Sequence, residues 1–199
     1  MSFSQHQGEF FKKNDHLFTT PNTSQEISLS RELIEQWQNR IQLHQSSLFK
    51  GLGENHEQGS FFDNQATNQI NNFEPLKLTP LSLSFWRWPK SPNHGPAIYL
   101  VMDRLERQDS YLMLYIGETI AAEKRWKGEH DCKYYLANYS EALQEARMNS
   151  QLSIRFWADV PKSTPKRRQL EQDLIQLWLP PFNKETRNRW ETPFTSDIK

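Results

Sequence analysis

A glutamate near the C-terminal end of the chain lies where an ionised group is costly. Glu171 precedes Leu174 by three positions and Trp178 by seven, so in a helix it shares their apolar face. A buried carboxylate without a partner costs several kcal/mol, so we expect a cation beside it, either a metal ion or an arginine. Arg167 lies four residues earlier, and such a pair stabilises a helix by roughly 0.3–0.5 kcal/mol.

Two tyrosines in the middle of the chain are also side chains that could take part in a reaction. Tyr115 comes two residues before Gly117, at the end of the apolar segment YLMLYIG, and Tyr99 lies in the segment AIYLVM. Each phenol either packs in the core with a bonded hydroxyl or faces a substrate at the end of its strand. We interpret Gly117 as the residue that lets the chain turn away tightly after the strand.

The elements that must position these residues indicate a small α/β fold with a three-stranded sheet. Apolar segments predict strands at 97–102 and 111–117, joined as an antiparallel hairpin by a long loop, and a third strand within 151–160. Three helices are expected between and after the strands: over 119–126 with Thr119 as its cap, over most of 133–149, and from 163 to the prolines at 180 and 181.

The N-terminal part of the chain reads differently. Residues 1–28 are polar and without periodicity, which is typical of disorder. A helix is predicted behind Ser30, because apolar residues recur at helical spacing at Leu33, Ile34, Trp37, Ile41 and Leu48. We expect this stripe to pack on the rest of the chain or on a second copy in a homodimer. A polar connection over 50–72 then leads to a proline-rich strap over 75–96, which is expected at a sheet edge.

Five elements in order resemble the GIY-YIG nuclease family. The first signature strand corresponds to Ala97–Tyr99 and the second is intact as Tyr115–Gly117. The family's helical arginine corresponds to Arg125, eight positions after the second signature, its metal-binding glutamate to Glu171 and its later asparagine to Asn183. The resemblance covers residues 95–190, which would be the catalytic domain. Residues 29–94 would form an N-terminal helical extension with linker and strap, and 191–199 a tail.

The chain departs from the family pattern at two positions. Ala97 replaces the first signature glycine and is small enough to keep the close packing. Many family members carry an aromatic residue or a histidine one helical turn after the arginine, where this chain has Glu129. We expect the neighbouring His130 to reach the site in its place if the helix ends at Gly128.

The resemblance implies a metal-dependent hydrolysis of phosphodiester bonds. One Mg²⁺ or Mn²⁺ ion would be held by Glu171, since magnesium needs only one or two protein carboxylates. Arg125 would bind the phosphate, Tyr99 would act as general base, and Tyr115 would orient the water or the phosphate. Asn183 would position the phosphate or Tyr99. Three cations beside the metal and asparagine positions are assigned to nucleic acid: Arg167, Arg168 and Lys184.

Composition sets limits on these interpretations. The chain has 199 residues, and its 24 lysines and arginines equal its 24 aspartates and glutamates, so any basic surface must be local. A single cysteine excludes an internal disulfide and fits a reducing compartment. The sequence shows no signal-peptide pattern and no membrane-spanning segment, so we predict a cytoplasmic protein that does not bind a membrane.

These observations lead to one expected function and two alternatives. We expect an endonuclease that acts on nucleic acid, DNA in preference to RNA. The first alternative keeps the GIY-YIG fold but binds nucleic acid or protein without cleavage, which a nearly balanced charge in the resembling region would suit. From Gly95 onward, the chain has 16 basic and 15 acidic residues. The second alternative is an assembly adaptor that uses the N-terminal helix.

Overall fold

The computed structural model describes most of the chain as one sheet with helices around it. The described residues are 29–51, 70, 73–87, 93–106, 110–125 and 131–195. The expectations for residues 1–28, for most of 50–72 and for His130 therefore lie outside the described residues. Within them, the fold is mixed α/β, with a three-stranded antiparallel sheet in the order β2-β1-β3 and four α-helices.

The predicted hairpin is present, and its strands are longer than expected. Strand β1 spans Ala97–Leu105 and β2 spans Ser110–Thr119. The polar residue Asp103 is part of β1 and fully buried, because Tyr139 and the backbone around Gln151 supply its hydrogen bonds. The expectation that the strand ends before Asp103 was wrong, since the sequence does not reveal these distant partners.

The third strand pairs with the other side of β1. Strand β3 spans Leu152–Trp157 and runs antiparallel to β1. The proline-rich strap meets its outer edge, where Leu81 and Ile154 exchange two backbone hydrogen bonds of 2.8 and 2.9 Å. Short 3-10 turns at Pro75–Lys77 and Phe85–Arg87 flank this bridge. The strap therefore protects an edge of the sheet, as its prolines predict.

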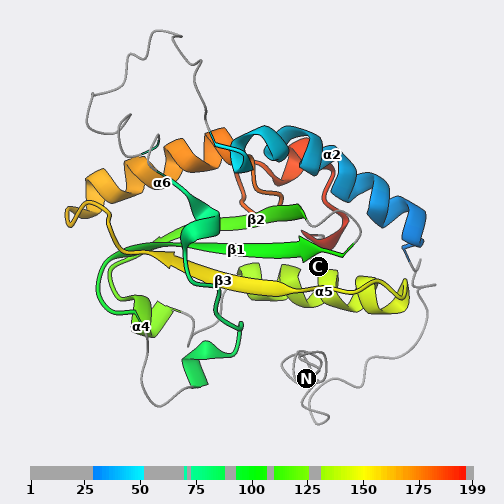
Figure 1. Ribbon diagram of the computed structural model, residues 1–199, viewed down its shortest axis with the longest axis horizontal. Helices are drawn as coiled ribbons and strands as arrows, with labels where there is room; N and C mark the ends of the chain where they lie inside the picture. Colours follow the sequence, from blue (N-terminus) through cyan, green and yellow to red (C-terminus); the bar gives the residue numbers. More distant parts are fainter. Residues whose placement is uncertain are drawn as a thin grey trace, which may run out of the picture.

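Two helices cover opposite faces of the sheet (Figure 1). Helix α5 spans Asp131–Glu145 and packs on the face that carries Tyr99, whereas α6 spans Thr164–Trp178 and packs on the face that carries Leu100. Helix α6 begins with a proline in its first turn and is capped at its C-terminal end by Leu179, which adopts a left-handed conformation with φ 47°. The short helix α4, Ala122–Arg125, follows β2.

The N-terminal helix packs within its own chain. Helix α2 spans Arg31–Phe49, and the Ser30 hydroxyl caps it by accepting a hydrogen bond from Leu33 N at 3.4 Å. It runs beside β2, with its first half in the α5-side core and its last residues in the α6-side core (Figure 1). Leu33 was expected in the apolar stripe but is 53% exposed. The buried face is completed instead by two glutamines, Gln38 and Gln45.

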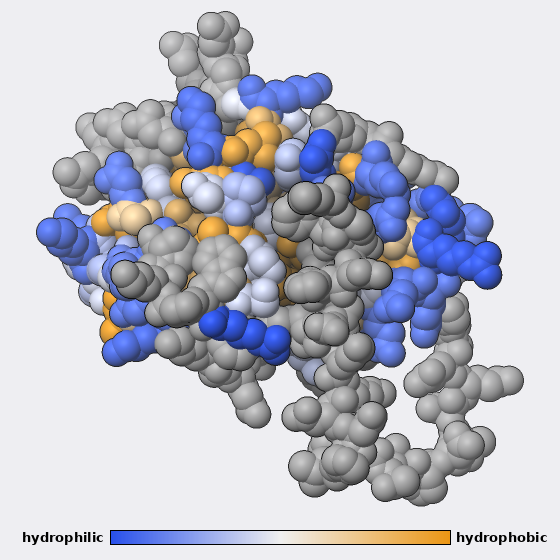
Figure 2. Space-filling view, turned by 60° about the horizontal axis from the view of Figure 1, so that its bottom comes forward, coloured by the Kyte–Doolittle hydropathy of each residue, from blue (hydrophilic) through white to orange (hydrophobic). Residues whose placement is uncertain are grey.

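The surface of the described part is mixed in character. Figure 2 shows apolar residues in patches toward the middle of one face, with strongly hydrophilic residues around its periphery. None of the helices within the described ranges is both long enough and apolar enough to cross a membrane.

Candidate functional site

Tyr99, Tyr115 and Arg125 gather at the end of the hairpin where β1 begins and β2 ends. The two tyrosine rings stack with centroids 5.8 Å apart and an interplanar angle of 26°. Arg125 Nε donates a 3.0 Å hydrogen bond to Tyr99 Oη, and its guanidinium carbon lies 5.3 Å from the centre of that ring. Tyr99 is fully buried, whereas Tyr115 is partly exposed. Tyr115 and Arg125 are therefore the members of this group that offer surface to a ligand.

Gly117 makes room for Tyr99. It is the direct cross-strand partner of Tyr99, and β2 continues beyond it to Thr119. A Cβ on Gly117 would lie 2.8 Å from Tyr99 Cε1 and closer still to Cζ and Oη, so a larger residue would require the Tyr99 ring to move. The expectation that Gly117 serves a tight turn was wrong. Its requirement comes from a residue 18 positions away, which sequence spacing alone does not reveal.

Both phenols are held in their neutral form. Burial raises the pKa of Tyr99 well above its ordinary value, and the neighbouring Tyr115 raises it further, against a lowering by Arg125. Burial also raises the pKa of Tyr115, followed by the effect of the nearby Cys132 thiol. The hydroxyls can therefore donate and accept hydrogen bonds at neutral pH, but Tyr99 needs additional positive charge before it can act as a base.

Glu171 lies close to the same end of β2. Its Oε1 accepts a 2.9 Å hydrogen bond from the backbone N–H of Glu118, and the carboxylate is partly buried. Burial raises the pKa of Glu171 to about 7, and the negative charges of Glu118 and Glu185 add to this against the lowering effect of the Glu118 N–H and Arg125. Glu171 is therefore a carboxylate that a bound cation would stabilise.

A pair between Glu171 and Arg167 was the alternative to a metal ion, and in the structure Arg167 bonds Glu118 instead. The Arg167 side chain has no exposed surface, and its Nε donates to Glu118 Oε2 at 2.9 Å. Its remaining hydrogen bonds go to Thr164 Oγ1 and to the carbonyl oxygens of residues 161 and 162. Arg167 is thus not placed to contact nucleic acid and acts as a link between α6 and β2. Arg168 is 68% exposed and lies 3.3 Å from Glu118 Oε1.

Asn183 holds the backbone of β2. Its Oδ1 accepts from Ile116 N at 3.0 Å, and its Nδ2 donates to Ile116 O at 2.8 Å. Both polar ends of the buried amide therefore bind the strand that carries Tyr115, whereas the side chain was expected to position the phosphate or Tyr99. Lys184, the next residue, is exposed.

Two residues beside the site were not anticipated from the sequence. Glu118 joins β2 to α6. Its role could not be predicted from local sequence, because its partner Arg167 lies 49 positions away. Lys133, near the start of α5, is partly buried, and burial and the charge of Arg125 lower its pKa. Lys133 thus adds a second positive charge close to Arg125, which favours an anion at this position.

The donor set around Glu171 fits a hydrated magnesium or manganese ion. Such an ion keeps several waters and takes one or two protein carboxylates. In the described part of the chain no three side chains of the types His, Cys, Asp and Glu are grouped to hold a metal ion. Glu171 would be the protein ligand for such an ion, because its carboxylate is partly buried and its raised pKa is that of a group that gains from a nearby cation.

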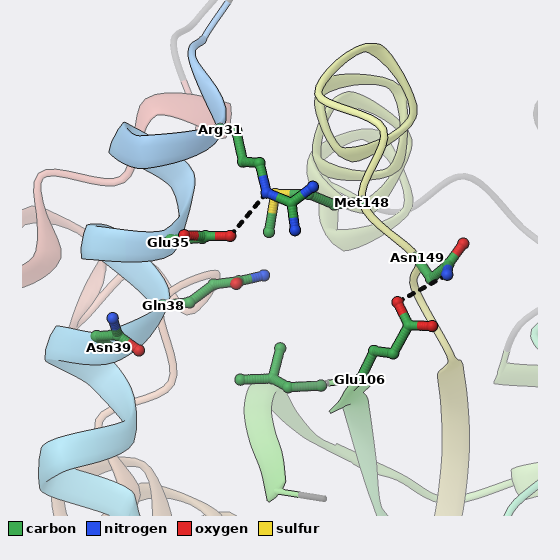
Figure 3. A pocket seen from close by; sticks show the side chains of 8 residues that line it. Arg31, Glu35, Gln38, Asn39, Glu106, Met148 and Asn149 are labelled. Carbon is green, nitrogen blue, oxygen red and sulfur yellow. Dashed lines mark hydrogen bonds and ion pairs between the residues drawn. The ribbon is translucent and has the colours of Figure 1, made fainter. Parts of the chain in front are cut away.

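A cavity of about 80 Å³ lies at the opposite end of β1 from Tyr99. Figure 3 shows its walls, which α2, the end of β1 and the segment before β3 supply. Its charged groups are paired with each other or with an amide: Arg31 with Glu35 at 2.8 Å, and Glu106 with Asn149 at 2.7 Å. This cavity is therefore separate from the tyrosine and glutamate residues of the candidate site.

Comparison of the chain with protein-family models, with curated proteins and with solved structures finds no match. The resemblance to the GIY-YIG family thus rests on the residues of this chain. Three of the five matched positions, Tyr99, Tyr115 and Arg125, are brought together at one end of the hairpin. Glu171 contacts the end of β2 through Glu118 N, and Asn183 contacts Ile116 of the same strand.

Proposed function

We propose that the chain is a metal-dependent nuclease that hydrolyses phosphodiester bonds, in DNA in preference to RNA. The observation that supports this most is the hydrogen bond from Arg125 to Tyr99, formed beside Tyr115 at the end of β2. A guanidinium, two phenols and a carboxylate of raised pKa at one strand end are the groups that bind and polarise a phosphodiester.

Each side chain has a distinct part in the proposed reaction. Arg125, whose Nε donates to Tyr99, binds a phosphate oxygen through its guanidinium, and Lys133 adds positive charge beside it. Tyr115, the more exposed phenol, orients the attacking water or the phosphate. Tyr99 accepts the proton of that water as a phenolate, after its own proton has passed to solvent, and this requires that positive charge at the site lowers the raised pKa of its phenol.

Glu171 would hold the metal ion. A bound Mg²⁺ or Mn²⁺ supplies positive charge that neutralises the phosphate and lowers the pKa of a bound water. Glu171 must be ionised for this role, and its pKa of about 7 means that it is ionised in part of the molecules at neutral pH. The Glu118 N–H, which donates to Oε1, fixes the orientation of the carboxylate.

The alternative is a domain of this fold that binds nucleic acid or protein without cleavage. Two observations favour it. Glu171 accepts a hydrogen bond from the backbone of β2, which is a structural role that needs no metal ion. The complete burial of Tyr99 points the same way, because a general base must reach the water that it activates.

A substrate panel separates these functions. The full chain is incubated with supercoiled plasmid, single-stranded DNA and RNA in Mg²⁺ or Mn²⁺, with matched samples in chelator. We expect cleavage that depends on the metal and is fastest on DNA. Binding of these nucleic acids without cleavage in either metal would contradict the nuclease and support the alternative.

A further inference from the structure

Within the described residues, strand β2 pairs with another strand on one side only. In the sheet order β2-β1-β3 it is an edge strand, so its outward N–H and C=O groups need partners from elsewhere. Several are satisfied by groups outside the sheet. Phe182 N donates to Leu114 O at 3.0 Å, and Glu171 accepts from Glu118 N. Two further residues of β2, Met113 and Ile116, are each held by a buried amide side chain.

Gln45 of α2 pairs with β2 as a strand residue would. Its Oε1 accepts from Met113 N at 2.8 Å, and its Nε2 donates to Met113 O at 3.0 Å. The same Nε2 donates to Trp178 O, at the end of α6, at 2.9 Å. Gln45 is fully buried, and a buried amide is tolerated only when such partners are present. An apolar side chain could pack in this place but would remove a hydrogen-bond partner from three backbone groups, Met113 N, Met113 O and Trp178 O.

The contact lies at an irregular point of the strand. Tyr115 pairs with Val101, but Met113 pairs with Met102, so Leu114 is an extra residue that forms a bulge in β2. A bulge interrupts the ladder between β1 and β2 and leaves the strand locally less constrained. Gln45 holds the residue before the bulge.

Asn183 holds the other side of the same segment through Ile116. Tyr115 therefore lies between two residues of β2, Met113 and Ile116, each gripped through both its N–H and its C=O by an amide side chain. Asn183 belongs to the segment after α6, and Gln45 belongs to helix α2 of the N-terminal extension.

We propose that Gln45 is a positioning residue for Tyr115, and that helix α2 belongs to the site because it fixes the bulged segment of β2. The catalytic part of this inference rests on the proposed nuclease function, whereas the structural part does not. Small displacements of a positioned group lower a rate steeply, so loss of the grip should act on Tyr115 before it unfolds the chain.

Helix α2 offers a matched control for the test. Gln42 lies one turn before Gln45, and its Nε2 donates at 2.9 Å to the hydroxyl of Ser110, at the first residue of β2 and away from Tyr115. The variants Gln45→Met and Gln42→Met remove the same amide from the same helix. A third variant, Gln45→Glu, keeps the acceptor for Met113 N but loses the donor for Met113 O.

Three measurements are made on the full chain: amide hydrogen exchange, ring signals of labelled tyrosine in NMR spectra, and kcat and KM for metal-dependent DNA cleavage. In Gln45→Met we expect faster exchange at Met113 and Ile116, a shifted Tyr115 ring signal, and a kcat about 10- to 100-fold lower with KM little changed. In Gln42→Met we expect exchange rates, kcat and KM within about 2-fold of the wild-type values and an unchanged Tyr115 ring signal. Gln45→Glu should fall between the two.

Several results would overturn the proposal. Rapid exchange of the Met113 amide in the wild-type chain would overturn it, and this result does not depend on whether Gln45→Met folds. An unchanged Tyr115 signal in folded Gln45→Met, or equal effects of the two glutamine variants, would reduce Gln45 to a general packing role. If the wild-type chain does not cleave DNA, the proposed nuclease function is refuted. The exchange rates and ring signals then still test whether Gln45 positions the segment of β2 that carries Tyr115.

Discussion

The phenol ring of Tyr99 lies across Gly117, its partner on the neighbouring strand. The same phenol accepts a hydrogen bond from Arg125, so three of the candidate site's residues depend on one close approach. A side chain at position 117 would occupy the place of the ring, which ties the identity of this residue to the geometry of the site.

Replacing Gly117 by alanine should therefore displace Tyr99. We expect Gly117→Ala to lower the free energy of unfolding by about 1–3 kcal/mol, as overpacking of a core does, and to weaken cleavage because the bond to Arg125 is lost. Urea unfolding measures the first effect. The double variant with Tyr99→Leu should lose less stability than the sum of the single variants. Additive losses would show that the clash is not with Tyr99.

The strands and helices were predictable because their signals are local. The capping serine Ser30, the apolar segments around Tyr99 and Tyr115, and the proline at the start of α6 each act over a few residues. The contacts that define the site are different, because they join distant parts of the chain. Gln45 reaches β2 across 68 positions.

The errors have the same origin. Periodicity placed Leu33 on the apolar face of α2, but the buried positions of that face include glutamines whose partners lie on other elements. Arg167 was assigned to nucleic acid from its neighbours in sequence, whereas its partner is Glu118. Which polar side chain is buried depends on where its partner lies, and one sequence does not give that information.

The buried carboxylate of Asp103 should make stability depend on pH. Burial raises its pKa from 3.8 to about 6, against the lowering effect of its hydrogen bonds to Tyr139, Gln151 and Ser150. A raised folded-state pKa means that the folded chain binds the proton more tightly, so this contribution to stability is lost as pH rises from about 4 to 6. The loss is on the order of 2–3 kcal/mol.

The variant Asp103→Asn removes this titration. Its free energy of unfolding, relative to that of the wild-type chain, should rise between about pH 4 and 6 and then stay level. Urea unfolding across this range is the measurement, and Glu106→Gln, an exposed acid on the adjoining turn, is the control. A constant difference between Asp103→Asn and the wild-type chain would show that Asp103 keeps the same charge in both states.

Arg125 should be essential for cleavage and dispensable for folding. Arg125→Ala removes the phosphate-binding guanidinium, and we expect cleavage to fall by at least about 100-fold while the unfolding midpoint changes little. Arg125→Lys should recover little activity, because an ammonium lacks the planar fork. Lys124→Ala, on the same short helix and exposed, is the control. An unchanged rate in Arg125→Ala would remove Arg125 from the site.

Metal binding at Glu171 should strengthen as pH rises. The pKa of Glu171 is about 7, chiefly because of burial, and an ion binds the ionised form. The ionised fraction grows about 10-fold between pH 6 and 8, so the apparent affinity for Mg²⁺ should grow by a similar factor. Calorimetric titrations at both values of pH measure this. Equal affinities would mean that another group holds the ion.

The central claim is that Glu171 holds the metal ion of a nuclease, and one comparison tests it most directly. Glu171→Gln keeps the shape of the side chain and an oxygen that can accept from Glu118 N, but it removes the charge. Mg²⁺ and Mn²⁺ are titrated by calorimetry into the wild-type chain and this variant, and DNA cleavage is followed in the same samples. We predict that the variant binds the metal more than about 100-fold more weakly and does not cleave, while its stability without metal is unchanged or raised. Metal binding and cleavage equal to those of the wild-type chain would contradict the account.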